Sequence, residues 1–190
     1  GKTFSETSEV LIYSHWYKSD GEEVDVDSSD DFNTPGNTKN GKVVVNRFND
    51  SPSYDIGVNL KVDDTKFHAS RAYSHYQSPR SDGGTTGSVY NLDDYRTFEG
   101  ETVGLSTETF HSYLERNFAY GEDNTLTAQL YYDEAKINVN LISNPHTQTG
   151  MFVGWKDYNS GTKIYTTIPY ITARGQGNIQ CGLQAEYSEV

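Results

Sequence analysis

The chain has 190 residues and carries 15 Lys and Arg against 27 Asp and Glu, so its formal net charge is -12 at pH 7. This excess of acid disfavours nucleic acid and anionic membrane surfaces as partners, because both require clustered basic side chains. No apolar run approaches the length of a transmembrane helix, and we expect no membrane insertion. Fifteen Tyr and eight Phe supply large apolar side chains, so the chain is too aromatic for disorder.

The length suits one domain, which we assign to residues 1–190. The chain begins Gly1-Lys2, without an initiating Met or an apolar signal segment, and we expect it to be excised from a longer chain. The single Cys181 has no possible partner within the chain. The lack of disulfides favours a reducing compartment or a bacterial origin.

The first predicted strand runs from Glu9 to Tyr17, where apolar positions alternate. The acidic, turn-rich stretch from Ser19 to Lys42 is predicted as a long loop. Its carboxylates between residues 20 and 31 suggest calcium as a possible ligand. The spacing lacks the Gly and Glu of an EF-hand loop, so a solvated acidic loop is favoured over a metal site.

The next strands are predicted at Lys42 to Phe48, Tyr54 to Val62 and Lys66 to Tyr76, followed by a second loop at Ser78 to Gly87. One helix is predicted from Thr107 to Asn117. Ser106 can cap this segment, and Phe110, Tyr113, Leu114 and Phe118 fall at helical spacing.

Strand patterns resume after this helix, and short hairpin turns are predicted at Asp133-Glu134 and at Asp157 to Gly161. In the last strand Ile179, Cys181 and Leu183 share one face, which predicts a buried Cys181. The predicted strands are Thr125 to Tyr132, Ala135 to Ile142, Gly150 to Lys156, Lys163 to Thr172 and Asn178 to Tyr187. Together they indicate an all-β fold: an antiparallel β-sandwich, jelly roll or barrel with at most one or two short helices.

One candidate catalytic set lies in the strand from Lys66 to Tyr76, where Arg71, Tyr73 and His75 share a face. An Arg could neutralise a uronate carboxylate while a Tyr or His moves a proton, as β-elimination of an acidic polysaccharide requires. A small secreted polysaccharide lyase or glycosidase is therefore an alternative. The negative charge opposes binding of a polyanion, and an amphipathic strand with stacked aromatic rings is favoured over the enzyme.

A candidate binding set surrounds the predicted hairpin and consists of Trp155, Asp157, Tyr158 and Asn159. An aromatic ring beside amide and carboxylate groups can stack on a sugar and bond its hydroxyls. Trp is also common in protein cores, so Trp155 could equally turn inward. No nucleophile-elbow, phosphate-loop or zinc-ligand pattern occurs, and we expect neither a metal nor a cofactor.

The polar segments Asn138 to Asn140, Thr147-Gln148-Thr149-Gly150 and Thr166-Thr167-Ile168-Pro169, with the unpaired Cys181, carry a class-level resemblance. In these segments the chain resembles the attachment heads and spikes of non-enveloped viruses, such as the astrovirus capsid spike. The resemblance implies a homodimeric spike on the virion surface that binds a host cell-surface receptor, either a glycan or a protein.

We therefore predict a non-catalytic recognition and attachment module. A bacterial or phage adhesin domain, secreted or at the cell surface, satisfies the same physical arguments and remains an alternative. Self-association is expected because Tyr and Phe exceed what one core can use, and exposed apolar patches generally mark interfaces.

Overall fold

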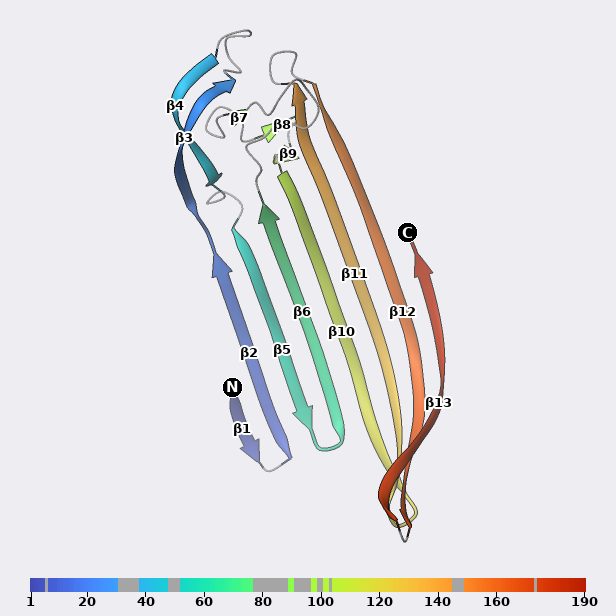
Figure 1. Cartoon of the computed structure of the whole chain (residues 1–190). Helices are drawn as coiled ribbons and strands as arrows, with labels where there is room; N and C mark the ends of the chain where they lie inside the picture. The colour runs from blue at the N-terminus through green and yellow to red at the C-terminus, as the bar shows by residue number, and fades with distance from the viewer. Residues whose placement is uncertain are drawn as a thin grey trace.

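The computed structural model describes residues 1–5, 7–30, 38–47, 52–76, 89–90, 97–98, 101–102, 104–144, 149–172 and 174–190. Every regular element in these ranges is a strand, and the largest assembly is an eight-stranded antiparallel sheet (Figure 1). The predicted all-β, antiparallel fold class is confirmed. None of the described residues forms a helix long and apolar enough to cross a membrane.

The eight strands lie in the sheet in chain order, with two excursions between them. They are β1 (Lys2–Ser5), β2 (Ser8–Tyr17), β5 (Ser53–Val62), β6 (Thr65–Tyr76), β10 (Gly104–Tyr120), β11 (Asn124–Asn144), β12 (Thr149–Thr172) and β13 (Gly175–Glu189). The excursions carry the smaller sheets, β4 (Thr38–Arg47), β3 (Asp20–Asp30) and β7 (Val89–Tyr90), and β8 (Thr97–Phe98) with β9 (Glu101–Thr102). Figure 1 shows the smaller sheets at one end of the large sheet and tight turns at the other.

The predicted helix from Thr107 to Asn117 is wrong, because this segment lies within strand β10. Phe110, Leu114 and Phe118 are four residues apart, and this spacing puts them on one face of a helix and equally on one face of a strand. The spacing alone therefore could not decide between a helix and a strand. Pairing does, since β10 is hydrogen-bonded to β6 on one side and to β11 on the other.

Three predicted loops or turns are also corrected. The acidic stretch from Ser19 to Lys42 contains β3 and the start of β4. The hairpins expected at Asp133-Glu134 and at Asp157 to Gly161 are absent, because β11 and β12 run through them and pair with each other there. Their turn-forming residues are outweighed by a continuous ladder of cross-strand pairs. The predicted loop from Ser78 to Gly87 lies outside the described residues.

The large sheet is a single layer. Among the residues whose side-chain burial the structure describes, the buried ones are Gly104, His75, Thr127 and Asn140, and none of these four has an apolar side chain. A soluble sheet normally packs one face against a second layer. Here the backbone ladder holds the strands together while the apolar surface that should stabilise them stays uncovered.

Two tyrosines lie directly over glycines of the neighbouring strand. Tyr13 is opposite Gly57, and Tyr131 is opposite Gly161. A Cβ atom added at Gly57 would come within 2.5 Å of the Tyr13 ring, and one at Gly161 would come within 2.5 Å of the Tyr131 hydroxyl. Each ring therefore rests on bare backbone instead of standing away from the sheet, a known use of glycine in strands.

This arrangement predicts that Gly161→Ala destabilises the sheet. The added methyl group would also meet the backbone oxygen of Ala185 at 2.5 Å, so the backbone itself must shift. Overpacking of this kind costs roughly 1–3 kcal/mol of unfolding free energy. Urea titration should show the loss, and Ser160→Ala on the same strand is the control. Equal midpoints for Gly161→Ala and the unmodified chain would contradict the prediction.

Candidate functional site: the two faces of the sheet

The register of the sheet sorts its side chains onto two chemically different faces, because directly opposed residues of antiparallel strands point the same way. We call the face that includes Ile12, Leu130 and Leu183 the apolar face. We call the face that includes His68, Glu115 and Glu186 the polar face. The large side chains of the apolar face are Val10, Ile12, Trp16, Tyr54, Ile56, Val58, Leu60, Val62, Phe67, Tyr73, Phe110, Leu114, Phe118, Tyr120, Leu126, Leu130, Tyr132, Tyr158, Ile164, Ile168, Ile179, Leu183 and Tyr187.

The apolar face lies open from one edge of the sheet to the other. Ile12 in β2 is 72% exposed, Leu130 in β11 is 56% exposed and Leu183 in β13 is 84% exposed. Cys181 lies on this face between Ile179 and Leu183, as its alternation predicts. The prediction that it is buried is wrong, since its thiol side is exposed and no second layer among the described residues covers it.

An aromatic row crosses the apolar face, with one ring on every strand from β2 to β13 of the large sheet. Three pairs of rings in this row are in contact range: the centroid distances are 5.2 Å for Trp16 and Tyr54, 5.8 Å for Tyr54 and Tyr73, and 6.0 Å for Phe110 and Tyr132. The members of the aromatic row are Trp16, Tyr54, Tyr73, Phe110, Tyr132, Tyr158 and Tyr187.

Beyond the aromatic row the same face turns polar within two residues. The Tyr132 hydroxyl donates to Glu134 Oε2 at 3.1 Å, and the Tyr187 hydroxyl donates to Glu189 Oε2 at 3.1 Å. Lys156 Nζ lies 2.8 Å from Glu134 Oε1. The hydrogen bond from Lys156 lowers the pKa of Glu134 and raises that of Lys156 itself. The rings thus mark a sharp boundary between hydrocarbon and charge.

The apolar face has a limited height along each strand. On β5 its residues run from Tyr54 to Val62, which is about 26 Å at roughly 3.3 Å per residue. On β10 they run from Phe110 to Phe118, and on β13 from Ile179 to Tyr187. Past the lower end of these apolar residues lie the tight turns at Asp63-Asp64 and at Gly121 to Asp123. The result is a belt of nearly constant height, with polar groups above and below it.

The polar face carries lateral networks that join neighbouring strands. Lys66 Nζ lies 3.0 Å from Glu115 Oε1, and this pair raises the pKa of Lys66, the hydrogen bond being its largest cause. On the far side the Tyr131 hydroxyl donates to Glu186 Oε2 at 2.5 Å, and Gln184 Nε2 donates to the same oxygen at 2.7 Å. The bond from Tyr131 lowers the pKa of Glu186. These groups bond within their own face.

A histidine and tyrosine cluster lies at the centre of the polar face. His68 Nδ1 is 2.7 Å from Asn59 Oδ1, and its Nε2 is 3.2 Å from Ser70 Oγ. The amide oxygen only accepts, so Nδ1 carries the proton and Nε2 accepts from the serine hydroxyl. Tyr113 stacks on His68 at 5.4 Å, and His111, bonded to Asp133, lies 5.4 Å from His68 between ring centroids. Burial, and secondarily repulsion from His111, lowers the pKa of His68.

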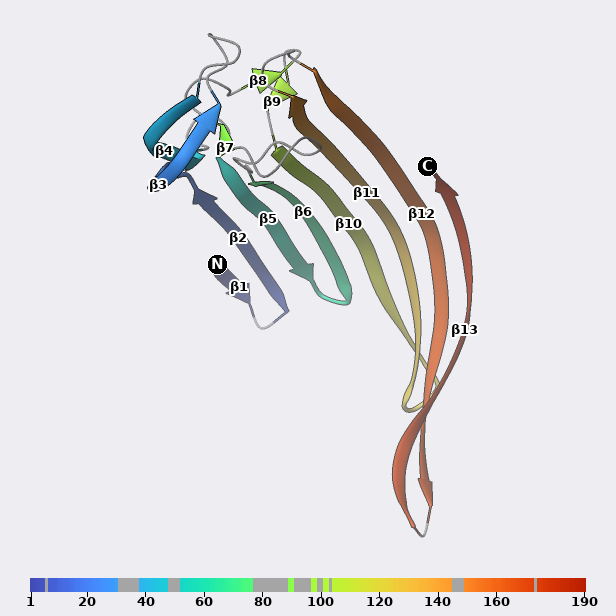
Figure 2. The ribbon, with the colours of Figure 1, turned by 45° about the horizontal axis from the view of Figure 1, so that its top comes forward.

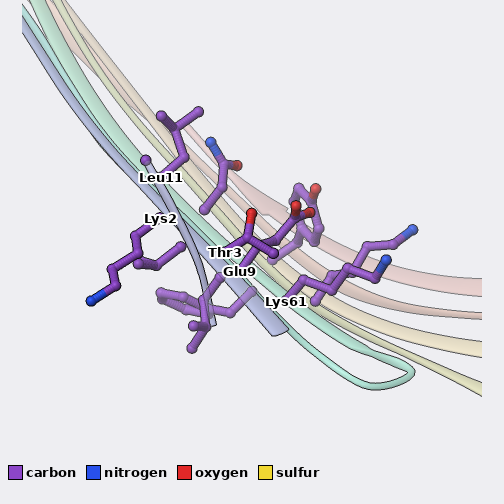
Figure 3. Close-up of a pocket in the computed structure, with 12 residues that line it drawn as sticks. Lys2, Thr3, Glu9, Leu11 and Lys61 are labelled. Atoms are coloured by element: carbon purple, nitrogen blue, oxygen red, sulfur yellow. The ribbon is translucent and has the colours of Figure 1, made fainter. Parts of the chain in front are cut away.

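The sheet is curved. Figure 2 shows that the long strands β10 to β13 bend along their length. In Figure 3, Lys2 of the apolar face points to one side of the sheet, while Leu11 and Lys61 of the polar face point to the other, toward which the strands bend. The polar face is therefore concave and the apolar face convex.

A hollow of about 460 Å³ lies where β1 meets β2, β5 and β6 (Figure 3). Its lining mixes the two faces: Val10, Leu60 and Phe67 belong to the apolar face, whereas Glu9 and Asn59 belong to the polar face. A small ligand touches one side of a single-layer sheet at a time. We therefore do not assign a binding site to this hollow.

The structure places the candidate catalytic residues Arg71, Tyr73 and His75 together on the apolar face of β6. Arg71 is bonded to the Glu108 carboxylate, so its guanidinium is already neutralised. Arg71 and Tyr73 line different hollows, and His75 is buried. This arrangement offers no shared cleft for a polysaccharide. Among the described residues no group of three or more His, Cys, Asp or Glu could hold a metal ion.

The candidate binding residues lie inside strand β12 and not at a hairpin tip. Trp155, Asp157 and Asn159 are on the polar face, whereas Tyr158 is on the apolar face in the aromatic row. The four side chains therefore do not form one contact surface. Comparison with known proteins adds no homologue: no family model matches the chain, and neither curated proteins nor solved structures give a match.

The polar cluster predicts that His68 titrates below its ordinary value of 6.5, because burial and His111 disfavour its protonated form. With a lowered folded pKa, its contribution to stability is complete above pH 6.5 and is lost as the pH falls through the folded pKa. NMR titration of the ring protons measures this midpoint. His111→Phe should raise it by removing a like charge. A midpoint at or above 6.5 in the unmodified chain would refute the prediction.

Proposed function

We propose, in place of the expectation of no membrane insertion, which considered apolar helices alone, that this chain is a membrane-embedded sheet. In it the apolar face contacts the hydrocarbon of a lipid bilayer and the polar face contacts water. The observation that carries the proposal is the uncovered apolar belt with the aromatic row along one border. A strand that crosses a bilayer needs about 9–11 residues, and the lipid-facing band of such sheets is roughly 25 Å tall. The belt from Tyr54 to Val62 matches this height.

The aromatic row supports the same conclusion. Tyr and Trp concentrate at membrane interfaces, because the ring is apolar while the hydroxyl or indole N–H remains in the wet headgroup layer. The hydroxyls of Tyr132 and Tyr187 bond carboxylates on the side away from the belt, as this location requires. A row of rings on successive strands is not needed in a sheet that packs on another protein layer.

The distribution of charge fits lipid contact better than the net charge suggests. Glu108, Glu134 and Lys156 are on the same face as the belt but at its aromatic border or beyond it. Arg71 lies inside the belt, one alternation below Tyr73, and its guanidinium is paired with Glu108 at the border. Arg116 lies near the lower border beside the Phe118 ring, and Lys2 lies in the short edge strand β1. Long basic side chains near a border can extend their charged ends to the interface.

A second copy of the chain is a poorer cover for the apolar face. Two convex surfaces touch over a small area, whereas lipid tails conform to any curvature. Lipid, however, leaves no water for the backbone groups of the edge strands β1 and β13, so the proposal requires these edges to be hydrogen-bonded, to each other or to further strands.

The attachment module expected from the sequence remains a second candidate. It is favoured by the neutral amides and hydroxyls of the polar face, such as Asn59, Ser70 and Gln129, and by the exposed indole of Trp155. A glycan or protein receptor could be bound there. The virion setting and the homodimer remain predictions, and dimerisation through the apolar face would appear as a doubled mass in water without detergent.

The proposal predicts opposite tolerance at adjacent residues of β11. Leu130 is on the apolar face and Gln129 is on the polar face. Leu130→Arg should reduce stability in vesicles by roughly 2–4 kcal/mol, the cost of an Arg facing the middle of a bilayer. Gln129→Arg is the matched control and should cost much less. Urea unfolding of both variants in lipid vesicles measures the difference, and equal losses would contradict lipid contact.

The chain's two tryptophans report on the two faces directly. Trp16 is in the aromatic row, and Trp155 is on the polar face. In vesicles of brominated phosphatidylcholine, the Trp155→Phe variant, which keeps Trp16, should be strongly quenched. The Trp16→Phe variant, which keeps Trp155, should be quenched by acrylamide in water and little by the lipid. Equal lipid quenching of both, or of neither, would overturn the proposed function.

A further inference from the structure

We infer that the polar face lines a water-filled path that passes small hydrophilic solutes and favours cations over anions. This inference rests on the proposed function, since a path exists only if the apolar face is in lipid. It concerns the polar face, whereas the support for lipid contact comes from the apolar face.

The first observation is that the polar side chains are bonded sideways. Lys66 bonds Glu115 on the neighbouring strand, and Tyr131 bonds Glu186 two strands away on the same face. Thr127 donates to Asn117 Oδ1 at 2.8 Å, again between neighbours. A face that packs on another protein layer would need partners across the interface. These groups are satisfied along the sheet, so the concave side needs no protein plug to pair them.

The second observation is that two tyrosine rings of this face lie close to the backbone. Tyr13 rests on Gly57 and Tyr131 rests on Gly161, so neither ring extends far into the concave space. Lys163 Nζ lies 4.6 Å from the centre of the Tyr131 ring, which holds this long side chain beside the sheet as well. The two glycines thereby keep these rings close to the sheet at one position of β5 and one position of β12.

The third observation is the balance of charge. The polar face has more carboxylates than ammonium groups, and it has no arginine in the described strands of the large sheet. The carboxylates are Glu9, Asp55, Glu115, Asp133, Asp157 and Glu186, and the ammonium groups are Lys61, Lys66 and Lys163.

Partners weaken the lysines further. Lys66 is paired with Glu115, and Lys163 lies over an aromatic ring. Asp157 Oδ1, by contrast, has no hydrogen-bond partner within the described structure. Carboxylates lining a narrow low-dielectric space concentrate cations and repel anions. Neutral solutes feel no such field and pass according to size.

The test is a planar bilayer with the full chain reconstituted, under a tenfold KCl gradient. The expected result is a reversal potential of the sign set by K⁺ flow. Glu186→Gln on the polar face should move it toward zero. Glu189→Gln on the same strand removes the same charge from the other face and should leave it unchanged. Raising the KCl concentration at a constant ratio should also reduce the selectivity, because salt screens the carboxylates.

The outcomes separate this inference from the proposed function. Lipid quenching of Trp16 without ion conduction, or with chloride preference, overturns the water path or its selectivity and leaves the membrane-embedded sheet intact. Equal shifts for Glu186→Gln and Glu189→Gln overturn the assignment of selectivity to the polar face. Absence of lipid quenching overturns both proposals. Potassium preference that responds only to Glu186→Gln supports the inference.

Discussion

The hydrogen-bonded ladder of eight strands forms one layer, and every other feature of this molecule follows from what that layer leaves uncovered. Alternation along each strand, kept in register from β2 to β13, gathers aliphatic and aromatic side chains on one face. A slip of one residue in any strand would move its apolar set to the wrong face. In water the uncovered apolar faces of several such sheets would associate, and the protein would aggregate. This constraint is met by the proposed environment, which supplies hydrocarbon on one side and water on the other.

Tyrosine has a different role on each of the two faces. On the apolar face the rings of Tyr132 and Tyr187 stand at a border and direct their hydroxyls to carboxylates beyond it. On the polar face Tyr131 lies down on Gly161, and its hydroxyl bonds Glu186. Glycine makes the second arrangement possible because it has no Cβ to hold the ring away. These three tyrosines thus show two uses of one amphipathic side chain, and neither use is the packing of a core.

Much of the strand pattern was predictable from alternation alone, as in Tyr54 to Val62 and Asn178 to Tyr187. What failed depended on partners that a local pattern cannot show. Phe110, Leu114 and Phe118 suit a helix or a strand equally, and β6 and β11 decide between them. Asp133 and Asp157 suggest turns, yet each lies inside a long ladder. Alternation correctly predicted that Cys181 lies on the same face as Ile179 and Leu183. The prediction that it is buried was wrong, because it assumed a second layer over that face. The aromatic row was missed because its members become neighbours only when the register of every strand is known.

The longest strands reach beyond the apolar belt. β11 and β12 continue past the aromatic row toward the smaller sheets, well beyond the height of the apolar belt (Figure 1). There Glu134 and Lys156 pair on the apolar face beyond the aromatic row, and this pair helps to order the part of the sheet that the proposal places in water. In the proposed arrangement the upper ends of these strands, with β3 and β4, lie clear of the membrane surface. Binding by these outer elements and a water path along the polar face are compatible, because they use different parts of one continuous sheet.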